Sequence, residues 1–173
     1  MSQPALIVID LQNDYFSGGA FPLANADATL ETTERAIASA HAKGIPVVLV
    51  QHVADPARGI SPFFNAGTRG VEIHERIRAV APDAPVVTKH FADAFEQTDL
   101  HETLQRLGVV ELILSGMMTQ NCVTFTALSR TADAYKKVTV LSDASTTVSE
   151  MLHAIAINAL STRVALARAE EVM

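Results

Sequence analysis

Residues 5–9 read Ala-Leu-Ile-Val-Ile, and Asp10 follows them directly. The run is short, apolar throughout and rich in branched side chains, which is typical of a strand buried on both faces. Strands of this kind belong to parallel sheets that helices cover on both sides. The stretch therefore predicts a buried strand of an α/β fold, with a carboxylate at its end.

Similar apolar runs recur along the chain and alternate with stretches of helical periodicity. The expected further strands span residues 47–50, 86–88, 109–114, 138–141 and 164–166. The expected helices span residues 28–42, 71–80, 99–107, 119–134 and 149–160. This alternation predicts a three-layer α/β fold, in which a six-stranded, mostly parallel sheet carries helices on both faces. Ligands of such sheets bind at the carboxyl ends of the strands.

The composition is that of a single globular domain, which we expect to span residues 1–173. Hydrophobic residues make up 49% of the chain and charged residues 18%. The formal charge of -6 argues against a nucleic-acid partner, which would need a basic face. No apolar run is long enough for a membrane span, and the single cysteine cannot form an internal disulfide. We therefore expect a cytoplasmic protein without a membrane partner.

Three chemically complementary residues stand at strand ends, namely Asp10, Lys89 and Cys122. Taken singly, each has an ordinary interpretation: Asp10 as a turn residue, Lys89 as a solvated lysine and Cys122 as a small buried hydrophobic residue. Together, at one edge of the sheet, they supply a thiol, a carboxylate to take its proton and a fixed positive charge. Because a helix N-terminus and an ammonium both favour a thiolate, we expect the pKa of Cys122 to lie below its usual value.

The same residues fall within three sequence blocks: IVIDLQNDYF at residues 7–16, VTK at residues 87–89 and GMMTQNCV at residues 116–123. In composition and order these blocks resemble the signature of the isochorismatase-like cysteine hydrolases, a family that includes nicotinamidases and N-carbamoylsarcosine amidohydrolases. The resemblance covers essentially the whole chain. It implies a sheet of Rossmann-like order and a catalytic triad in which Cys122 attacks, Asp10 is the base and Lys89 stabilises charge.

The resemblance also implies an oxyanion hole. Members of the family have a non-proline cis peptide just before the helix, which here would join Met117 and Met118. It would turn the N–H of Met118 toward the oxyanion, beside the N–H of Cys122.

The thiol bears on the reaction, because family members that cleave isochorismate have no need of it. We therefore expect hydrolysis of a small-molecule C–N bond, in an amide, ureide or carbamoyl compound, through a thioester on Cys122. The alternative is a non-catalytic member of the same fold that binds a small molecule or a protein. A nucleotide-binding function is disfavoured, since neither Gly-x-Gly-x-x-Gly nor a P-loop follows any expected strand.

A metal is not expected, and nor is any other cofactor. Nicotinamidases of the family hold a metal with an Asp-x-His pair and a further histidine. The matching stretch here begins Gln51-His52 and lacks that aspartate, which leaves His52 as a pocket-wall or hydrogen-bonding residue. His74 and His90 have ordinary surface and rim interpretations, whereas Asp55 is the one residue that could complete a site of different geometry.

The aromatic residues of the chain suggest how a substrate is held. Residues 54–70 form a long, Pro- and Gly-rich segment of the kind that often serves as a lid or wall. The expected substrate-binding residues are Tyr15, His52, Phe63, Phe64 and Phe91. Phe63 and Phe64 either fold back over the pocket or reach across a subunit interface. Members of the family are commonly dimers or larger, and the second interpretation agrees with this, so we expect a homo-oligomer, a dimer or larger.

Overall fold

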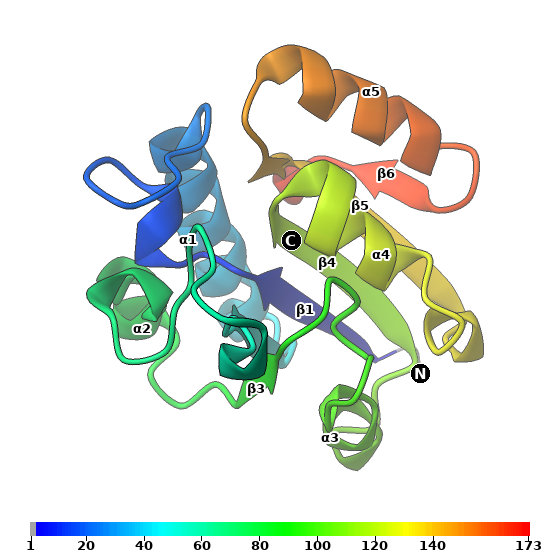
Figure 1. Cartoon of the computed structure of the whole chain (residues 1–173). Coiled ribbons are helices and arrows are strands. Elements are labelled where there is room, and N and C mark those ends of the chain that lie inside the picture. The colour runs from blue at the N-terminus through cyan, green and yellow to red at the C-terminus, as the bar shows by residue number, and fades with distance from the viewer. Residues whose placement is uncertain (1–2) are drawn as a thin grey trace.

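The computed structural model describes residues 3–173 and contains one sheet of six strands, all paired in parallel, in the order β3-β2-β1-β4-β5-β6 (Figure 1). The strands are β1 (Pro4–Ile9), β2 (Val47–His52), β3 (Val86–Lys89), β4 (Glu111–Met117), β5 (Lys137–Thr146) and β6 (Ala165–Ala167). This is a Rossmann-like order, with its switch point between β1 and β4. The predicted α/β architecture is confirmed.

The helices are α1 (Ala26–Ala42), α2 (Glu75–Val80), α3 (Leu100–Arg106), α4 (Thr124–Ala127), α5 (Glu150–Leu160) and α6 (Ala169–Val172). The helices form two layers, and an apolar cluster joins each layer to its face of the sheet. One cluster joins α1, α2 and α6 to one face of the sheet, and the other joins α3, α4 and α5 to the opposite face. Along β1, Leu6 and Val8 face the first cluster whereas Ala5, Ile7 and Ile9 face the second, as the two-residue period of a strand requires.

The stretch predicted as one helix over residues 119–134 is broken into three short pieces. It begins with a π-helical turn at Thr119–Val123, continues as α4 and ends in a 3-10 turn at Ala132–Ala134. In the first piece the hydroxyl of Thr124 also donates to the carbonyl of Thr119, at 2.6 Å. The prediction of one continuous helix is wrong because helical periodicity does not show where the backbone changes from one helical form to another.

Several other elements differ from expectation. The predicted helix over residues 71–80 begins only at Glu75, because residues 69–71 form a 3-10 turn. Strand β4 ends at Met117 and not at residue 114, and β5 extends to Thr146, past an irregularity in its pairing with β4. The short helix α6 was not anticipated. The carboxyl ends of β1 and β3 lie within one residue of the expected positions.

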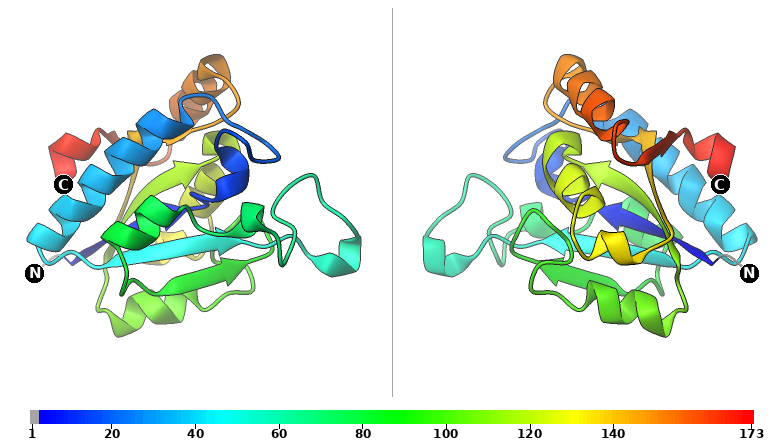
Figure 2. Two further views of the ribbon diagram at one scale, coloured as in Figure 1. Left: turned by 90° about the vertical axis from the view of Figure 1, so that its left-hand side faces the viewer. Right: turned by 90° about the vertical axis from the view of Figure 1, so that its right-hand side faces the viewer.

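A loop that follows β2 projects beyond the rest of the molecule (Figure 2). It carries a 3-10 turn at Pro56–Arg58, and near its tip the side chain of Ile60 is 97% exposed. Because the loop leaves the sheet at the carboxyl end of β2, it stands beside the edge at which the candidate catalytic residues lie. Among residues 3–173, no helix combines the length and the apolar character that crossing a membrane requires.

One glycine fixes the close approach of β4 to β1 at this edge. Gly116 has φ +132°, and a Cβ added there would lie 2.0 Å from the carbonyl oxygen of Ile9. No other residue type fits such a position without moving the backbone. The residues that follow Ile9 and Gly116 are thereby brought next to each other.

Candidate active site

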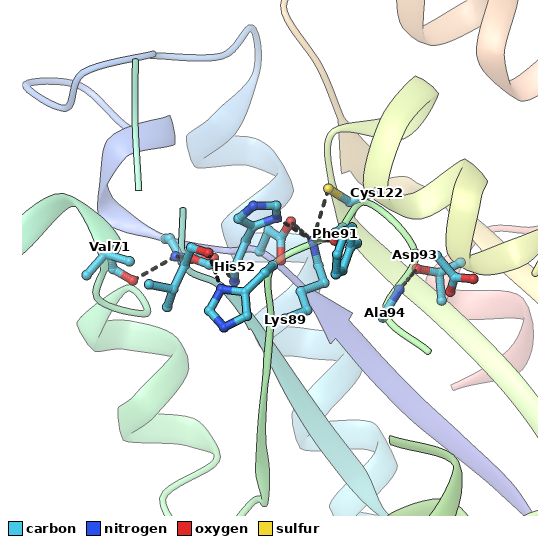
Figure 3. A network of polar contacts seen from close by, with 12 residues as sticks. His52, Val71, Lys89, Phe91, Asp93, Ala94 and Cys122 are labelled. Atoms are coloured by element: carbon cyan, nitrogen blue, oxygen red, sulfur yellow. Dashed lines mark hydrogen bonds and ion pairs between the residues drawn. The ribbon is translucent and has the colours of Figure 1, made fainter. Parts of the chain in front are cut away.

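Asp10, Lys89 and Cys122 meet at the carboxyl edge of the sheet. The Nζ atom of Lys89 lies 2.9 Å from Oδ2 of Asp10 and 3.2 Å from Sγ of Cys122. The side chains of Asp10 and Lys89 are fully buried, and Cys122 is 2% exposed. In Figure 3 the side chains of Lys89 and Cys122 point toward one another. The structure therefore brings together the three residues that the sequence singled out.

Each of these residues is positioned by the end of a strand. Asp10 follows β1 in the left-handed backbone region at φ +56°, which aspartate tolerates better than most residues, and its N–H donates to the carbonyl of Val50. Lys89 is the last residue of β3. Cys122 lies in the π-helical turn after β4, and the Met117–Met118 peptide bond that precedes this turn is cis.

The ammonium of Lys89 remains charged in this environment. Burial alone would lower the pKa of Lys89, but the Asp10 carboxylate and Cys122 beside it outweigh that effect and raise the pKa. The carboxylate oxygens of Asp10 meet Lys89 as an ion pair, and neither accepts a well-aligned hydrogen bond from any residue between 3 and 173. The carboxylate of Asp10 therefore keeps lone pairs that can accept a proton.

The expected low pKa of the Cys122 thiol is wrong. Burial raises the pKa of Cys122, the nearby carboxylate of Asp10 raises it further, and the ammonium of Lys89 only partly opposes them. The reason lies in the packing, because the sulfur is in a dry site and not at the exposed first turn of a regular helix. The resting group is a thiol, and forming the thiolate requires a base in contact.

Lys89 has two further acceptors that the sequence did not reveal. Its Nζ lies 2.8 Å from Nδ1 of His52 and 3.1 Å from the carbonyl oxygen of Phe91. Figure 3 shows these residues beside Lys89. Burial and the Lys89 charge lower the pKa of His52 to about 4, against weaker opposition from Asp10. His52 is therefore neutral near pH 7, so its Nδ1 accepts a hydrogen bond from the ammonium.

Gln12 holds the backbone of His52, a role that sequence reasoning did not assign. Oε1 of Gln12 accepts from the His52 N–H at 2.8 Å, and Nε2 donates to the carbonyls of His52 at 2.8 Å and Val71 at 2.7 Å. The residue is fully buried. The available signal was the alternation of polar residues at positions 10, 12 and 14 after a buried strand.

Asp14 holds the backbone of the projecting loop, as Gln12 holds that of His52. Its Oδ2 accepts from the N–H of Phe64 at 2.7 Å and its Oδ1 from the N–H of Ala20 at 3.0 Å. At Gly70, an added Cβ would lie 2.0 Å from Oδ1 of Asp14, so the two segments approach closely. Asp14 thus fastens residues 54–70 to the segment that follows β1.

Phe63 and Phe64 fold back onto their own domain. The Tyr15 ring lies 4.6 Å from the ring of Phe64 and 5.4 Å from that of Phe63, measured between centroids. Phe64 is buried and Phe63 is half-buried. The intramolecular interpretation of this pair is the one observed, and the exposed patch that suggested an oligomer is absent from the described chain. The oligomer stays a prediction, now without that support.

The side chains of the remaining candidate residues have partners outside the triad. The guanidinium of Arg58 lies 5.9 Å from the ring centroid of Phe91, which brings the projecting loop over this residue. His90 is exposed and its Nδ1 lies 2.7 Å from the carbonyl oxygen of Val53. His74 caps α2 by accepting from the N–H of Arg76. The contacts of His74 and His90 are thus made away from Lys89.

One group of side chains has the donor types of a metal site. A carboxylate oxygen of Asp10, a ring nitrogen of His52 and Sγ of Cys122 all lie within 4.8 Å of one another. Each of the three residues, however, also lies within 3.2 Å of Nζ of Lys89, so an ammonium already occupies the space between them. Asp55 is engaged with the N–H of Ala57 at 2.9 Å. A metal ion does not fit this arrangement while Lys89 is charged.

The comparisons with known proteins agree with the fold and the site. The family model described as Isochorismatase domain matches residues 4–171. An uncharacterized isochorismatase family protein of Bacillus subtilis is 38% identical over 131 residues, which cover 76% of this chain and 71% of that protein. A nicotinamidase of Escherichia coli is 27% identical over 177 residues, covering 83% of each chain.

Solved structures give the same result. A crystal structure titled as an isochorismatase hydrolase from Oleispira antarctica superposes with a TM-score of 0.87 at 33% identity, covering 99% of this chain and 96% of that one. Fold and site together define a Rossmann-like hydrolase of the amidohydrolase type. Within that class, the chain belongs to the isochorismatase family.

Proposed function

We propose that this protein hydrolyses a C–N bond of a small molecule, an amide, ureide or carbamoyl compound, through a thioester on Cys122. One observation carries the proposal, which is the contact of a buried ammonium with both a carboxylate and a thiol at the switch point. The family relationship, with relatives named nicotinamidase, supports C–N chemistry. Residues 1–173 would act as one catalytic domain.

In the first step, Asp10 takes the proton of the Cys122 thiol as Sγ attacks the carbonyl carbon. The raised pKa of the thiol makes this base necessary, because little thiolate exists before substrate binds. Lys89 keeps its positive charge and offsets the charge that moves from Asp10 to sulfur and on to the carbonyl oxygen. The backbone N–H groups of Met118 and Cys122 are the proposed donors to the resulting oxyanion.

In the second step, the protonated Asp10 gives its proton to the leaving nitrogen. The C–N bond breaks, ammonia or an amine departs, and the acyl group remains on sulfur as a thioester. Asp10 then takes a proton from water, whose oxygen attacks the thioester carbon, and the C–S bond breaks. Asp10 gives that proton to the leaving sulfur, so the cycle consumes one water and restores both the thiol and the carboxylate.

The surroundings of the thiol favour a small substrate with an apolar part. Tyr15, Phe63 and Phe64 form an aromatic wall, and the backbone carbonyl of Phe91 accepts a hydrogen bond from Lys89. Because Cys122 is only 2% exposed, we infer that the projecting loop moves when a larger substrate enters. The cation that this chemistry needs is supplied by Lys89, so the proposed reaction requires no metal.

The test is a substrate screen read by intact-protein mass spectrometry. The purified protein is incubated with nicotinamide, ureides, carbamoyl amino acids and simple amides, with Cys122→Ala as the control. We expect turnover of at least one compound and an acyl adduct that Cys122→Ala lacks. Ligand binding without turnover or adduct across the panel would instead support the non-catalytic binding protein.

A further inference from the structure

We propose that His52 is a positioning residue that fixes the ammonium of Lys89 between Asp10 and Cys122, and that Gln12 holds His52 in place for this purpose. The inference rests on the proposed function and deepens it. It replaces the expectation that His52 serves mainly to contact substrate.

The first argument comes from the partners of Lys89. Its Nζ makes three hydrogen bonds, the shortest to Nδ1 of His52 at 2.8 Å and the longest to Sγ of Cys122 at 3.2 Å, and an ion pair with Asp10 at 2.9 Å. The carboxylate of Asp10 attracts the ammonium most strongly, because it is charged. Without an acceptor at His52, that attraction would draw Nζ toward Asp10 and away from the sulfur that it must stabilise.

The second argument comes from the way His52 is held. The side-chain amide of Gln12 uses both N–H groups and its oxygen, two of these three bonds going to the backbone of His52. Exchanging the amide oxygen and nitrogen would set donors against donors, so only one orientation satisfies the site. Gln12 is fully buried, and its side-chain amide therefore fixes the backbone of His52 relative to that of Val71.

Two substitutions separate the acceptor from the ring. His52→Asn can place an amide oxygen near the position of Nδ1 but removes the ring, whereas His52→Phe keeps a ring and removes the acceptor. On a substrate found in the screen, we expect His52→Phe to lower kcat roughly ten- to a hundredfold, as the loss of a hydrogen bond to a charged group predicts. KM should change little, and His52→Asn should recover most of kcat.

A second measurement needs no substrate. The rate of Cys122 alkylation by iodoacetamide is followed against pH, and its midpoint should rise in His52→Phe relative to wild type but not in His52→Asn. If no amide is turned over by wild type, the proposed function fails while this measurement still tests the positioning role. If His52→Phe does not fold, His52→Leu replaces it as the variant without an acceptor.

Several results would overturn the inference. One is a His52→Phe protein with wild-type kcat and an unchanged alkylation midpoint. Another is a His52→Asn protein impaired as severely as His52→Phe in both measurements, which would assign the role to the ring. A change in KM alone would return His52 to substrate binding.

Discussion

Lys89 and its side-chain partners Asp10, His52 and Cys122, called the cluster below, lie at the same edge of the sheet as the loop over residues 54–70. The two regions are built differently. In the cluster, charged and polar groups are buried together and every position follows from the end of a strand. In the loop, the tip is exposed at Ile60, and Asp14 and two aromatic side chains fasten the base. The difference teaches that the chemistry of this protein is fixed by the sheet, whereas access to it depends on a lightly anchored segment.

The comparison predicts the largest effect inside the cluster. Asp10→Asn preserves size but removes the proton acceptor, so turnover should fall by about 10²- to 10⁴-fold, as expected for loss of a general base. Steady-state kinetics on a substrate from the screen measures this. Asp83→Asn, the same change at an exposed position, is the matched control. Near-normal turnover of Asp10→Asn would show that the base lies elsewhere.

The cluster should also dominate the pH dependence of stability on the acid side. Because the folded pKa of His52 lies near 4, the unfolded chain binds a proton there first as the pH falls below about 6.5. The free energy of unfolding therefore falls by roughly 2 kcal/mol between about pH 6.5 and 5. Burial also lowers the pKa of His74 and of His153, so protonation of these residues in the unfolded chain lowers the stability further as the pH falls.

Urea unfolding at about pH 7 and about pH 5 measures this loss, with His52→Asn as the comparison. The variant should lose less stability over the same interval, because one of the proton-binding groups is gone from its unfolded state. Equal losses in the two proteins would mean that His52 titrates normally in the folded state.

A smaller effect is expected where the loop is anchored. Asp14→Ala removes the acceptor of the Phe64 and Ala20 N–H groups and should cost about 1–3 kcal/mol of stability, with a raised KM. Asp55→Ala is the control, because its carboxylate also accepts a backbone N–H but is half-exposed, and it should cost about 1 kcal/mol or less. Similar effects of the two variants would contradict the anchoring role of Asp14.

The smallest expected effect is that of metal removal. Lys89 already provides a positive charge between Asp10, His52 and Cys122, so dialysis against EDTA should leave turnover unchanged. Addition of Zn²⁺ to the dialysed protein provides the comparison. Activity that disappeared with EDTA and returned with Zn²⁺ would show that an ion displaces the ammonium.

The sequence predicted most of the frame and the three residues of the cluster, because buried parallel strands are apolar throughout and polar residues at their ends stand out. It did not predict that the helix after β4 is broken into a π-helical turn, α4 and a 3-10 turn, because periodicity does not show where a helix is interrupted. It also missed Gln12 and Asp14, since their partners lie about 40 and 50 residues away and only the fold brings them together. The expectation of a low pKa for Cys122 is wrong for a related reason, because the spacing of residues does not show how deeply a side chain is buried.

The number of hydrogen bonds at Lys89 has a consequence for how the reaction proceeds. An ammonium has three N–H groups, and here they go to Nδ1 of His52, the carbonyl of Phe91 and Sγ of Cys122. Asp10 meets the ammonium through charge alone, so its lone pairs stay open to the proton that leaves the thiol. One N–H already points at the sulfur on which negative charge develops, and neither hydrogens nor heavy atoms need rearrange to follow that charge.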